Sequence, residues 1–189
     1  NKLYVHSLVQ YNKVLLQRNK LLKELFFRPE YEETLDVWDM QLVNYGREVI
    51  KFRREFIKQL NEIIHAIHLS LTGGREDISI SYEPYTREDQ MEDILKKNRA
   101  QDMKQKTTLS GPHRDDISFI VNGIDIRRFG SQGQQRTAAL SLKLSELQLV
   151  KQLSHDDPIL LLDDVLSELH NSRQNNIMSA ITHIQTKIT

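Results

Sequence analysis

Apolar residues recur every seven positions through the first part of the chain, and this spacing constrains the fold more than any other feature. One segment carries two such rows, Leu8, Leu15 and Leu22, and, three positions further on, Tyr11, Arg18 and Leu25. A second segment carries the longer rows Leu35, Leu42, Val49, Phe56 and Ile63, and Trp38, Tyr45, Phe52, Gln59 and Ala66. These are the a and d positions of heptads, which mark the buried face of long packed helices.

The two heptad segments predict two long helices, at residues 1–27 and 32–72. The stretch "FFRPEYEET" breaks the repeat between them, and Pro29 marks the break. An antiparallel hairpin with its apolar seams face to face is the simplest arrangement. Two amphipathic helices of an ordinary bundle would show the same pattern, and the spacing does not separate the two.

Residues 73–106 complete a first, largely helical domain, expected to span 1–106. Gly73-Gly74 ends the second helix, "ISISYEPY" alternates like a strand, and Thr86 with Asp89 resembles a capping box before a polar helix. That helix carries a basic cluster, which consists of Lys96, Lys97, Arg99, Lys104 and Lys106. The cluster could contact phosphate backbones, but a solvated helix face is the favoured interpretation.

Composition excludes several classes of protein. Lys and Arg together number 26, and Asp and Glu together also number 26, so the formal net charge is zero. The chain is therefore not a uniformly basic nucleic-acid binder. Cys is absent, which removes disulfides and thiolate metal sites and suits a reducing, cytoplasmic setting. No apolar run is long enough to cross a bilayer, and no signal peptide opens the chain, so no membrane association is expected.

Residues 107–189 change character and predict an α/β domain. Asn122-Gly123, between alternating apolar residues, is a strong signal for a β-hairpin. A helix is expected at about 134–153, followed by the aliphatic run 159–162, which is typical of a strand in a parallel sheet with both faces covered. A further helix and a strand at "QTKIT" would continue the strand–helix–strand order of an α/β layer.

Asp163 and Asp164 follow the aliphatic strand directly. Ligands bind at the carboxyl ends of strands in such sheets, and two adjacent anions there are costly unless a cation or a reacting group uses them. Asp163 suits a Mg²⁺ ligand, and Asp164 could polarise an attacking water. Both could equally be capping or turn residues.

The segment "FGSQGQQRT" precedes the predicted helix. Ser131, Gly133 and the N–H groups after them lie at a helix N-terminus, which attracts anions. The glutamines Gln132, Gln134 and Gln135 add amide donors without charge. A simple Ser N-cap would account for Ser131 but for none of the glutamines.

The motifs "GPHRDD", "FGSQGQQRT" and "ILLLDDVLSEL", taken in this order, resemble the second half of an ABC-type ATPase head. Together they resemble more closely the RecF family of bacterial recombination mediators, over Thr107–Thr189. The resemblance implies a fold that is α/β plus helical. It would be a partial ABC-type head, with a mixed sheet and helices, joined to an antiparallel long-helix domain.

The resemblance also implies roles for individual residues. The signature motif, which contacts the γ-phosphate of ATP held by a partner subunit, would be Ser131, Gln132, Gly133, Gln134 and Gln135. Asp163 would be the Walker B ligand of Mg²⁺, and Asp164 would be the catalytic base, a position that ABC proteins usually fill with Glu. The D-loop would be Ser167, Glu168 and Leu169. The family usually has Asp where His170 stands, which leaves the detailed contact of the D-loop open.

The function implied for the intact protein is that of a DNA replication and repair protein. It would bind single-stranded and gapped duplex DNA, form an ATP-dependent homodimer, act with other recombination mediator proteins in loading recombinase, and hydrolyse ATP slowly. The DNA-binding residues stay unassigned. The rival hypotheses are an SMC-like head, whose arms are usually far longer, and a non-enzymatic helical adaptor.

None of the seven glycines starts or completes the P-loop pattern G-x-x-x-x-G-K-[ST]. The chain also opens without Met, in a segment that already has helical character. It is therefore expected to be an internal fragment that neither binds ATP tightly nor hydrolyses it alone.

Overall fold

The computed structural model describes residues 1–154, 158–162, 178 and 186–188. Its contacts divide the chain into two units, each built from two segments. Unit 1 comprises Asn1–Glu55 and Tyr82–Asp116, and unit 2 comprises Phe56–Ser81 and Ile117–Thr189. The sequence instead suggested contiguous domains that divide after residue 106, and that boundary stays a prediction.

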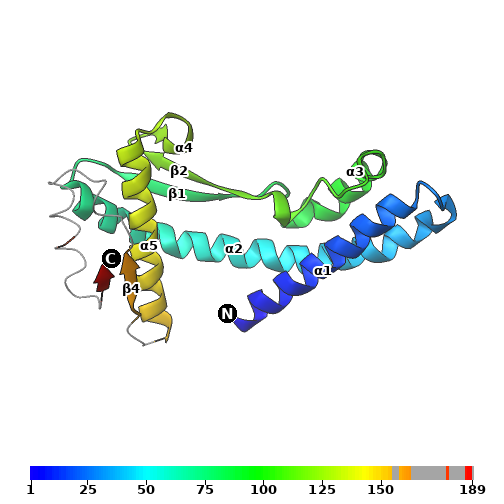
Figure 1. Ribbon diagram of the computed structural model, residues 1–189, viewed down its shortest axis with the longest axis horizontal. Coiled ribbons are helices and arrows are strands. Elements are labelled where there is room, and N and C mark those ends of the chain that lie inside the picture. Colours follow the sequence, from blue (N-terminus) through cyan, green and yellow to red (C-terminus); the bar gives the residue numbers. More distant parts are fainter. Residues whose placement is uncertain (155–157, 163–177, 179–185, 189) are drawn as a thin grey trace. The chain divides into compact units, whose positions relative to one another are not determined.

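Unit 1 is built on two antiparallel helices, α1 (Lys2–Glu24) and the first part of α2 (Leu35–Thr72) (Figure 1). The Asn1 side chain caps α1, and Pro29 opens the short 3-10 helix η1 (Pro29–Thr34) that leads into α2. Tyr11 and Val14 of α1 share a buried cluster with α2 and with α3 (Met91–Gln105). The predicted antiparallel pair of long helices is confirmed.

The heptad rows of α2 are only partly correct. Phe56, predicted to be buried, has 44% of its surface exposed, whereas its neighbour Ile57 is buried. The buried row from the middle of the helix onward is Ile50, Ile57, Ile64 and Leu71, one position beyond the predicted row. A straight α-helix has 3.6 residues per turn, whereas a seven-residue row assumes 3.5. The row therefore drifts around the helix by roughly 20° per heptad relative to the buried face. Over a helix of 38 residues this drift moves burial to the next position.

A fully buried arginine ties unit 1 together. Arg18 Nε donates to Asp39 Oδ1 at 2.6 Å, and Arg18 Nη1 donates to Asp102 Oδ2 at 2.7 Å. The same Nη1 donates to Thr108 Oγ1, and Leu109 N–H donates to Asp102 Oδ1 at 3.0 Å. These bonds join α1, α2, α3 and the segment after α3. A charged side chain can be buried at this d position because its two carboxylate partners, Asp39 and Asp102, are buried beside it.

The start of α3 differs from the prediction. Thr86 forms no capping box: its hydroxyl is buried and has no hydrogen-bond partner among the described residues. The short 3-10 helix η2 (Glu88–Gln90) comes first, and α3 begins at Met91. The helix therefore starts too late for Thr86 to reach its free N–H groups.

Most of a small sheet with the order β1-β2-β3 belongs to unit 2; its strands are β1 (Ile78–Glu83), β2 (Asp116–Val121) and β3 (Ile124–Asp125). The hairpin predicted at Asn122-Gly123 is confirmed: β2 and β3 are antiparallel, with Val121 opposite Ile124. Asn122 and Gly123 have φ values of 49° and 80°. A type I′ turn requires positive φ at both central residues.

The one-turn helix α4 (Ile126–Phe129) and the long helix α5 (Gln132–Ser154) follow the hairpin. The predicted aliphatic strand is β4 (Leu160–Leu162), which pairs in parallel with β5 (Thr186–Ile188), so the expected parallel pairing is confirmed. Leu160 is buried, but Leu161 is 70% exposed, so the expected covering of both strand faces does not hold there. No helix within the described residues is both long and apolar enough to span a membrane.

Candidate functional site

The start of α5 is held by a tight turn from α4. Gly130 N–H donates to Ile126 O at 3.1 Å, and a Cβ at Gly130 would lie 2.5 Å from that same oxygen. The Gln135 side chain reaches back and donates from Nε2 to Ile126 O at 2.8 Å. Close backbone packing therefore excludes a larger residue at position 130, and Gln135 fixes α5 to α4.

Ser131 and Gln134 form a complete capping box at the head of α5. Ser131 N–H and Oγ–H donate to Gln134 Oε1 at 3.0 and 3.2 Å, and Gln134 N–H donates to Ser131 Oγ at 3.2 Å. This is the S-x-x-Q pattern of a capped helix. The expectation that an N-cap would leave the glutamines unexplained is therefore wrong for Gln134, and the bond to Ile126 O accounts for Gln135.

The electrostatics at this helix end favour an anion. The first turn of α5 contains no acidic residue, so no side-chain charge offsets the positive end of the helix dipole. Ser131 and Gln132 are exposed. In this turn the Gln134 N–H is capped by Ser131 Oγ, and the two Ser131 donors bond the Gln134 side chain. The predicted anion site is thus exposed at Ser131 and Gln132, and its role stays a prediction.

Buried polar contacts anchor the rest of α5 inside unit 2. Thr137, Ser141 and Ser145 lie four residues apart, and each hydroxyl donates to the carbonyl four residues earlier. Since Ser141 Oγ–H is used in this way, its oxygen accepts from Nδ1–H of buried His68 at 2.8 Å. The bond joins α2 to α5 and was not predicted. The row of small hydroxyls at helical spacing could have indicated a polar contact on this face of α5, but not its partner.

The "GPHRDD" motif lies in unit 1 and has a packing role there. Gly111 has a φ of 129°, and a Cβ on it would lie 2.5 Å from Tyr11 Oη. His113 Nε2–H donates to Thr108 O at 3.0 Å, so Nδ1 accepts from Tyr11 Oη–H at 2.7 Å. Burial lowers the pKa of His113 below its ordinary value and raises that of Tyr11, which keeps the histidine neutral and the tyrosine protonated.

Asp115, in the same motif, is an acceptor for three groups. Arg53 Nη1 donates to it at 3.2 Å, Tyr85 N–H donates at 2.9 Å, and Tyr82 Oη–H also donates. Burial raises the pKa of Tyr82, with the bond to Asp115 as the second cause, so the hydroxyl stays a donor. The motif thus fastens α1, α2 and the end of β1 together within unit 1.

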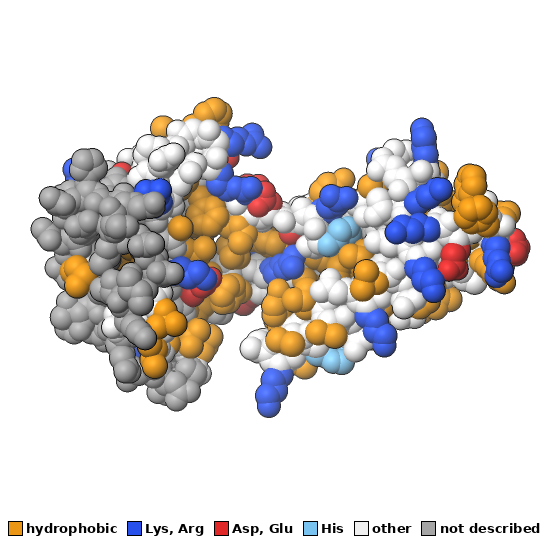
Figure 2. Space-filling view, in the orientation of Figure 1, with side chains coloured by type: hydrophobic (Ala, Val, Ile, Leu, Met, Phe, Trp, Pro, Cys, Tyr) orange, Lys and Arg blue, Asp and Glu red, His pale blue; other side chains and the backbone are white. Residues whose placement is uncertain are grey.

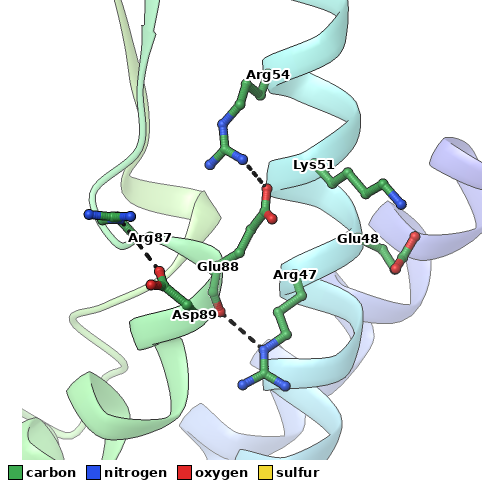
Figure 3. A pocket seen from close by; sticks show the side chains of 7 residues that line it. All are labelled: Arg47, Glu48, Lys51, Arg54, Arg87, Glu88 and Asp89. Atoms are coloured by element: carbon green, nitrogen blue, oxygen red, sulfur yellow. Dashed lines mark hydrogen bonds and ion pairs between the residues drawn. The ribbon is translucent and has the colours of Figure 1, made fainter.

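A polar cleft of about 460 Å³ lies in unit 1 between α2 and the segment before α3 (Figure 3). Figure 3 shows the Glu88 side chain reaching Arg54, at 2.6 Å, while the Glu88 carbonyl accepts from Arg47 Nε. Arg87 lies 3.4 Å from Asp89. The three arginines are thus bonded to oxygen atoms within the cleft; Lys51 also lines it, and no anion site is assigned there.

The basic cluster of α3 divides into different roles. Lys96 pairs with Glu92 at 2.8 Å, Arg99 pairs with Asp39 at 2.6 Å, and Lys106 Nζ lies 4.4 Å from the centre of the Phe26 ring. Lys97 and Lys104 are exposed. Figure 2 shows Lys and Arg side chains spread over this face of unit 1, with a hydrophobic patch where α1 ends. The favoured interpretation, a largely solvated face, agrees with this arrangement.

The remaining predicted site residues lie outside the described part of the chain. They are Asp163, Asp164, Ser167, Glu168 and Leu169, and the D-loop neighbour His170 lies there too. Within the described ranges, no group of three or more His, Asp or Glu residues could hold a metal ion. The five residues predicted as the signature motif are consecutive and lie at the start of α5; their role stays a prediction, as do the Mg²⁺, catalytic and D-loop assignments.

The chain is similar along its whole length to curated RecF proteins. No family model matches the chain. The DNA replication and repair protein RecF of Agathobacter rectalis is 55% identical over 189 residues, the whole chain and 52% of that protein. RecF of Lachnoclostridium phytofermentans is 54% identical over the same share. The chain spans about half the length of the curated relatives it matches.

Two solved structures of the recombination mediator RecF in the RecFOR pathway also match the whole chain. The structure described as RecF-ATPrS has a TM-score of 0.87 at 36% identity, and the chain covers 53% of it. The structure described as RecF-ATP has a TM-score of 0.88 at 35% identity, again with 53% covered.

The fold and the capped, exposed start of α5 define part of an ABC-type ATPase head joined to a long-helix domain. Along its whole length the chain is homologous to RecF, the DNA replication and repair protein.

Proposed function

We propose that the protein containing this chain is an ATP-dependent DNA replication and repair protein that acts as a recombination mediator. The observation that carries this proposal is the exposed start of α5, which has no acidic residue in its first turn, in a chain that aligns throughout with RecF structures described with ATP and ATPrS. In this proposal Ser131 and its neighbours meet the γ-phosphate of ATP held by a second copy of the protein.

The chemistry of the helix start suits this role. Ser131 offers a hydroxyl and an N–H group, Gly133 leaves room for close approach, and the helix dipole favours the phosphate charge. These donors carry no charge themselves, so their hold on the phosphate depends on the short distances that a closed dimer provides. Loss of the γ-phosphate would then release the dimer.

Mg²⁺ fits the donor set that follows β4. Asp163 would bind it as the Walker B carboxylate, and carboxylate oxygens are the ligands that Mg²⁺ prefers. When bound, Mg²⁺ would neutralise negative charge on the phosphates of the nucleotide. Asp164 would accept a proton from the attacking water. Ser167, Glu168 and Leu169 would cross the dimer interface as the D-loop.

The proposed partners follow from the same assignment. They are single-stranded and gapped duplex DNA, a second copy of the protein, and other recombination mediator proteins in the cytoplasm. Arg54 and Arg87 of the polar cleft are paired with carboxylates, so DNA contacts are not assigned to that cleft.

Ser131→Arg in the intact protein tests the proposal. A bulky cation at this position should abolish ATP-driven dimerisation, measured by sedimentation velocity, while ATP binding measured by titration calorimetry stays nearly unchanged. Ser131→Ala is the matched control: it loses the same N-cap and the same hydroxyl donor without the added bulk, so it should weaken dimerisation less than Ser131→Arg. A Ser131→Arg protein that still dimerises with ATP would count against the assignment.

The chain alone gives a second test. Because no P-loop pattern occurs in its sequence, it should neither bind ATP with micromolar affinity nor hydrolyse it. Calorimetric titration with ATP and Mg²⁺ measures this, and micromolar binding would overturn the expectation.

A further inference from the structure

Helix α1 carries a second apolar row, on the face that does not pack within unit 1. Val5, Val9 and Leu16 are 56–70% exposed, whereas Tyr11 on the other face is buried. With Asn12, the row occupies positions 5, 9, 12 and 16, which is the alternating three- and four-residue spacing of a coiled-coil seam. Scattered apolar side chains on a surface need no explanation, but a row at this spacing forms a face that another helix can cover.

The exposed charges of α1 are almost all positive. They are Lys2, Lys13, Lys20 and Lys23, and the one acidic residue in the helix is Glu24, 3.9 Å from Lys20. The other three lysines form no ion pair within the part of the chain that the structure describes. Figure 2 shows hydrophobic side chains and Lys or Arg side chains together on the side of unit 1 where α1 lies. The face is therefore both apolar and positively charged.

This chemistry distinguishes between possible occupants of the face. A second copy of the chain would bring two sets of lysines together, and like charges side by side oppose association. An amphipathic helix with acidic residues beside its apolar row matches both features. Its apolar side chains would cover Val9 and Leu16, and its carboxylates would face Lys13, which lies one helical turn after Val9.

Single-stranded nucleic acid fits the face less well, because bases stack on exposed aromatic rings and the row has none. The exposed rings of Phe26 and Phe27 come only after α1 ends. They are followed in η1 by the exposed glutamates Glu30, Glu32 and Glu33, which would repel a phosphate backbone.

We propose that the outer face of α1, built on Val5, Val9, Leu16 and Lys13, is a docking surface for an acidic amphipathic helix of a partner protein. The row is about 17 Å long, which suits a transient contact. Asn12 in its middle would fix the register of the partner helix. The proposal does not rest on the proposed nucleotide role, because all of these residues lie in α1.

A synthetic peptide of about three heptads, with Leu at the seam positions and Glu beside them, is the probe. Its comparisons are the same peptide with Lys in place of every Glu, and a single-stranded oligonucleotide. Fluorescence anisotropy with the intact protein measures binding of each. The Glu peptide should bind with a Kd in the micromolar range, and the Lys peptide at least about tenfold more weakly.

Three variants locate the contact. Leu16→Glu removes an apolar contact and adds a like charge, so it should weaken binding of the Glu peptide at least about tenfold. Met40→Glu, on α2, is the matched control: Met40 is 60% exposed but lies outside the row, so peptide binding should be unchanged. Lys13→Glu should weaken binding of the Glu peptide and strengthen binding of the Lys peptide.

Absence of binding by the Glu peptide contradicts the proposal, and this is the result expected if the rest of the polypeptide covers the row. Equal effects of Leu16→Glu and Met40→Glu contradict it too. Loss of oligonucleotide binding in Leu16→Glu would identify a nucleic-acid surface instead, and loss of self-association without ATP would identify a second copy. ATP-driven dimerisation should be unchanged in Leu16→Glu, so a failure of the proposed function is distinguishable from a failure of this surface.

Discussion

Replacing Arg18 with Met should destabilise unit 1 more than any surface change. The substitution removes the bonds to Asp39, Asp102 and Thr108, all of 2.6–2.7 Å. Asp39 keeps its second partner, Arg99, so the cost falls chiefly on Asp102, which is fully buried. Breaking a buried ion pair by removing one partner costs about 3–5 kcal/mol.

Native-state hydrogen exchange of the intact protein measures this loss at the amides of α1 and α3. A change of 3–5 kcal/mol corresponds to about two to three and a half decades in protection factor. Arg99→Met is the matched control: Arg99 is 23% exposed, and Asp36, one of its partners, is 70% exposed, so the loss should be about 1 kcal/mol.

A double variant sharpens the test of the network. Arg18→Met combined with Asp102→Leu leaves no charge at the Asp102 position, so it should be more stable than Arg18→Met alone. The reasoning is refuted if Arg18→Met changes protection by less than about tenfold, or if Arg99→Met costs as much.

Three further predictions concern the motifs. Burial holds the pKa of His113 below the ordinary value of about 6.5, so the unfolded state binds more protons than the folded state as the pH falls. The exchange protection of α1 should therefore be full above about pH 6.5 and fall on acidification, and it should fall less in His113→Asn. An equal dependence on pH in both proteins would contradict this. Gly130→Ala should speed exchange at the start of α5 by forcing a Cβ against Ile126 O. Gly123→Ala, which has open space around its Cβ but a φ of 80°, should strain the β2–β3 turn and speed exchange there instead; equal effects at the start of α5 would refute the packing argument. Asp164→Asn in the intact protein should trap an ATP-bound dimer, and unchanged ATP turnover would remove Asp164 from the role of base.

Local features were predictable from the sequence because few residues decide them. The Asn122-Gly123 hairpin needs two residues that tolerate positive φ, and an aliphatic run typical of parallel sheets indicated β4. The two long helices followed from their apolar spacing. Their buried face was predicted less well, since a strict seven-residue row ignores the drift of a straight helix.

Contacts distant in sequence could not be predicted. Arg18 meets Asp39 and Asp102 from 21 and 84 residues away, and His68 meets Ser141 from 73 residues away. No local pattern pairs such residues, because burial of a charge depends on which helices pack together. The capping box is a different case: S-x-x-Q at Ser131–Gln134 is a local signature that could have been found in the sequence.

The central claim is that the start of α5 completes a nucleotide site on a second copy of the protein. Subunit complementation tests it most directly. Ser131→Arg and Asp163→Asn variants of the intact protein are each expected to lack ATPase activity. Mixed in equal amounts, they should recover ATPase activity, at most about half of the wild-type value, because each mixed two-fold dimer contains one intact composite site. No recovery, in a mixture shown by mass spectrometry to contain mixed dimers, would contradict the claim.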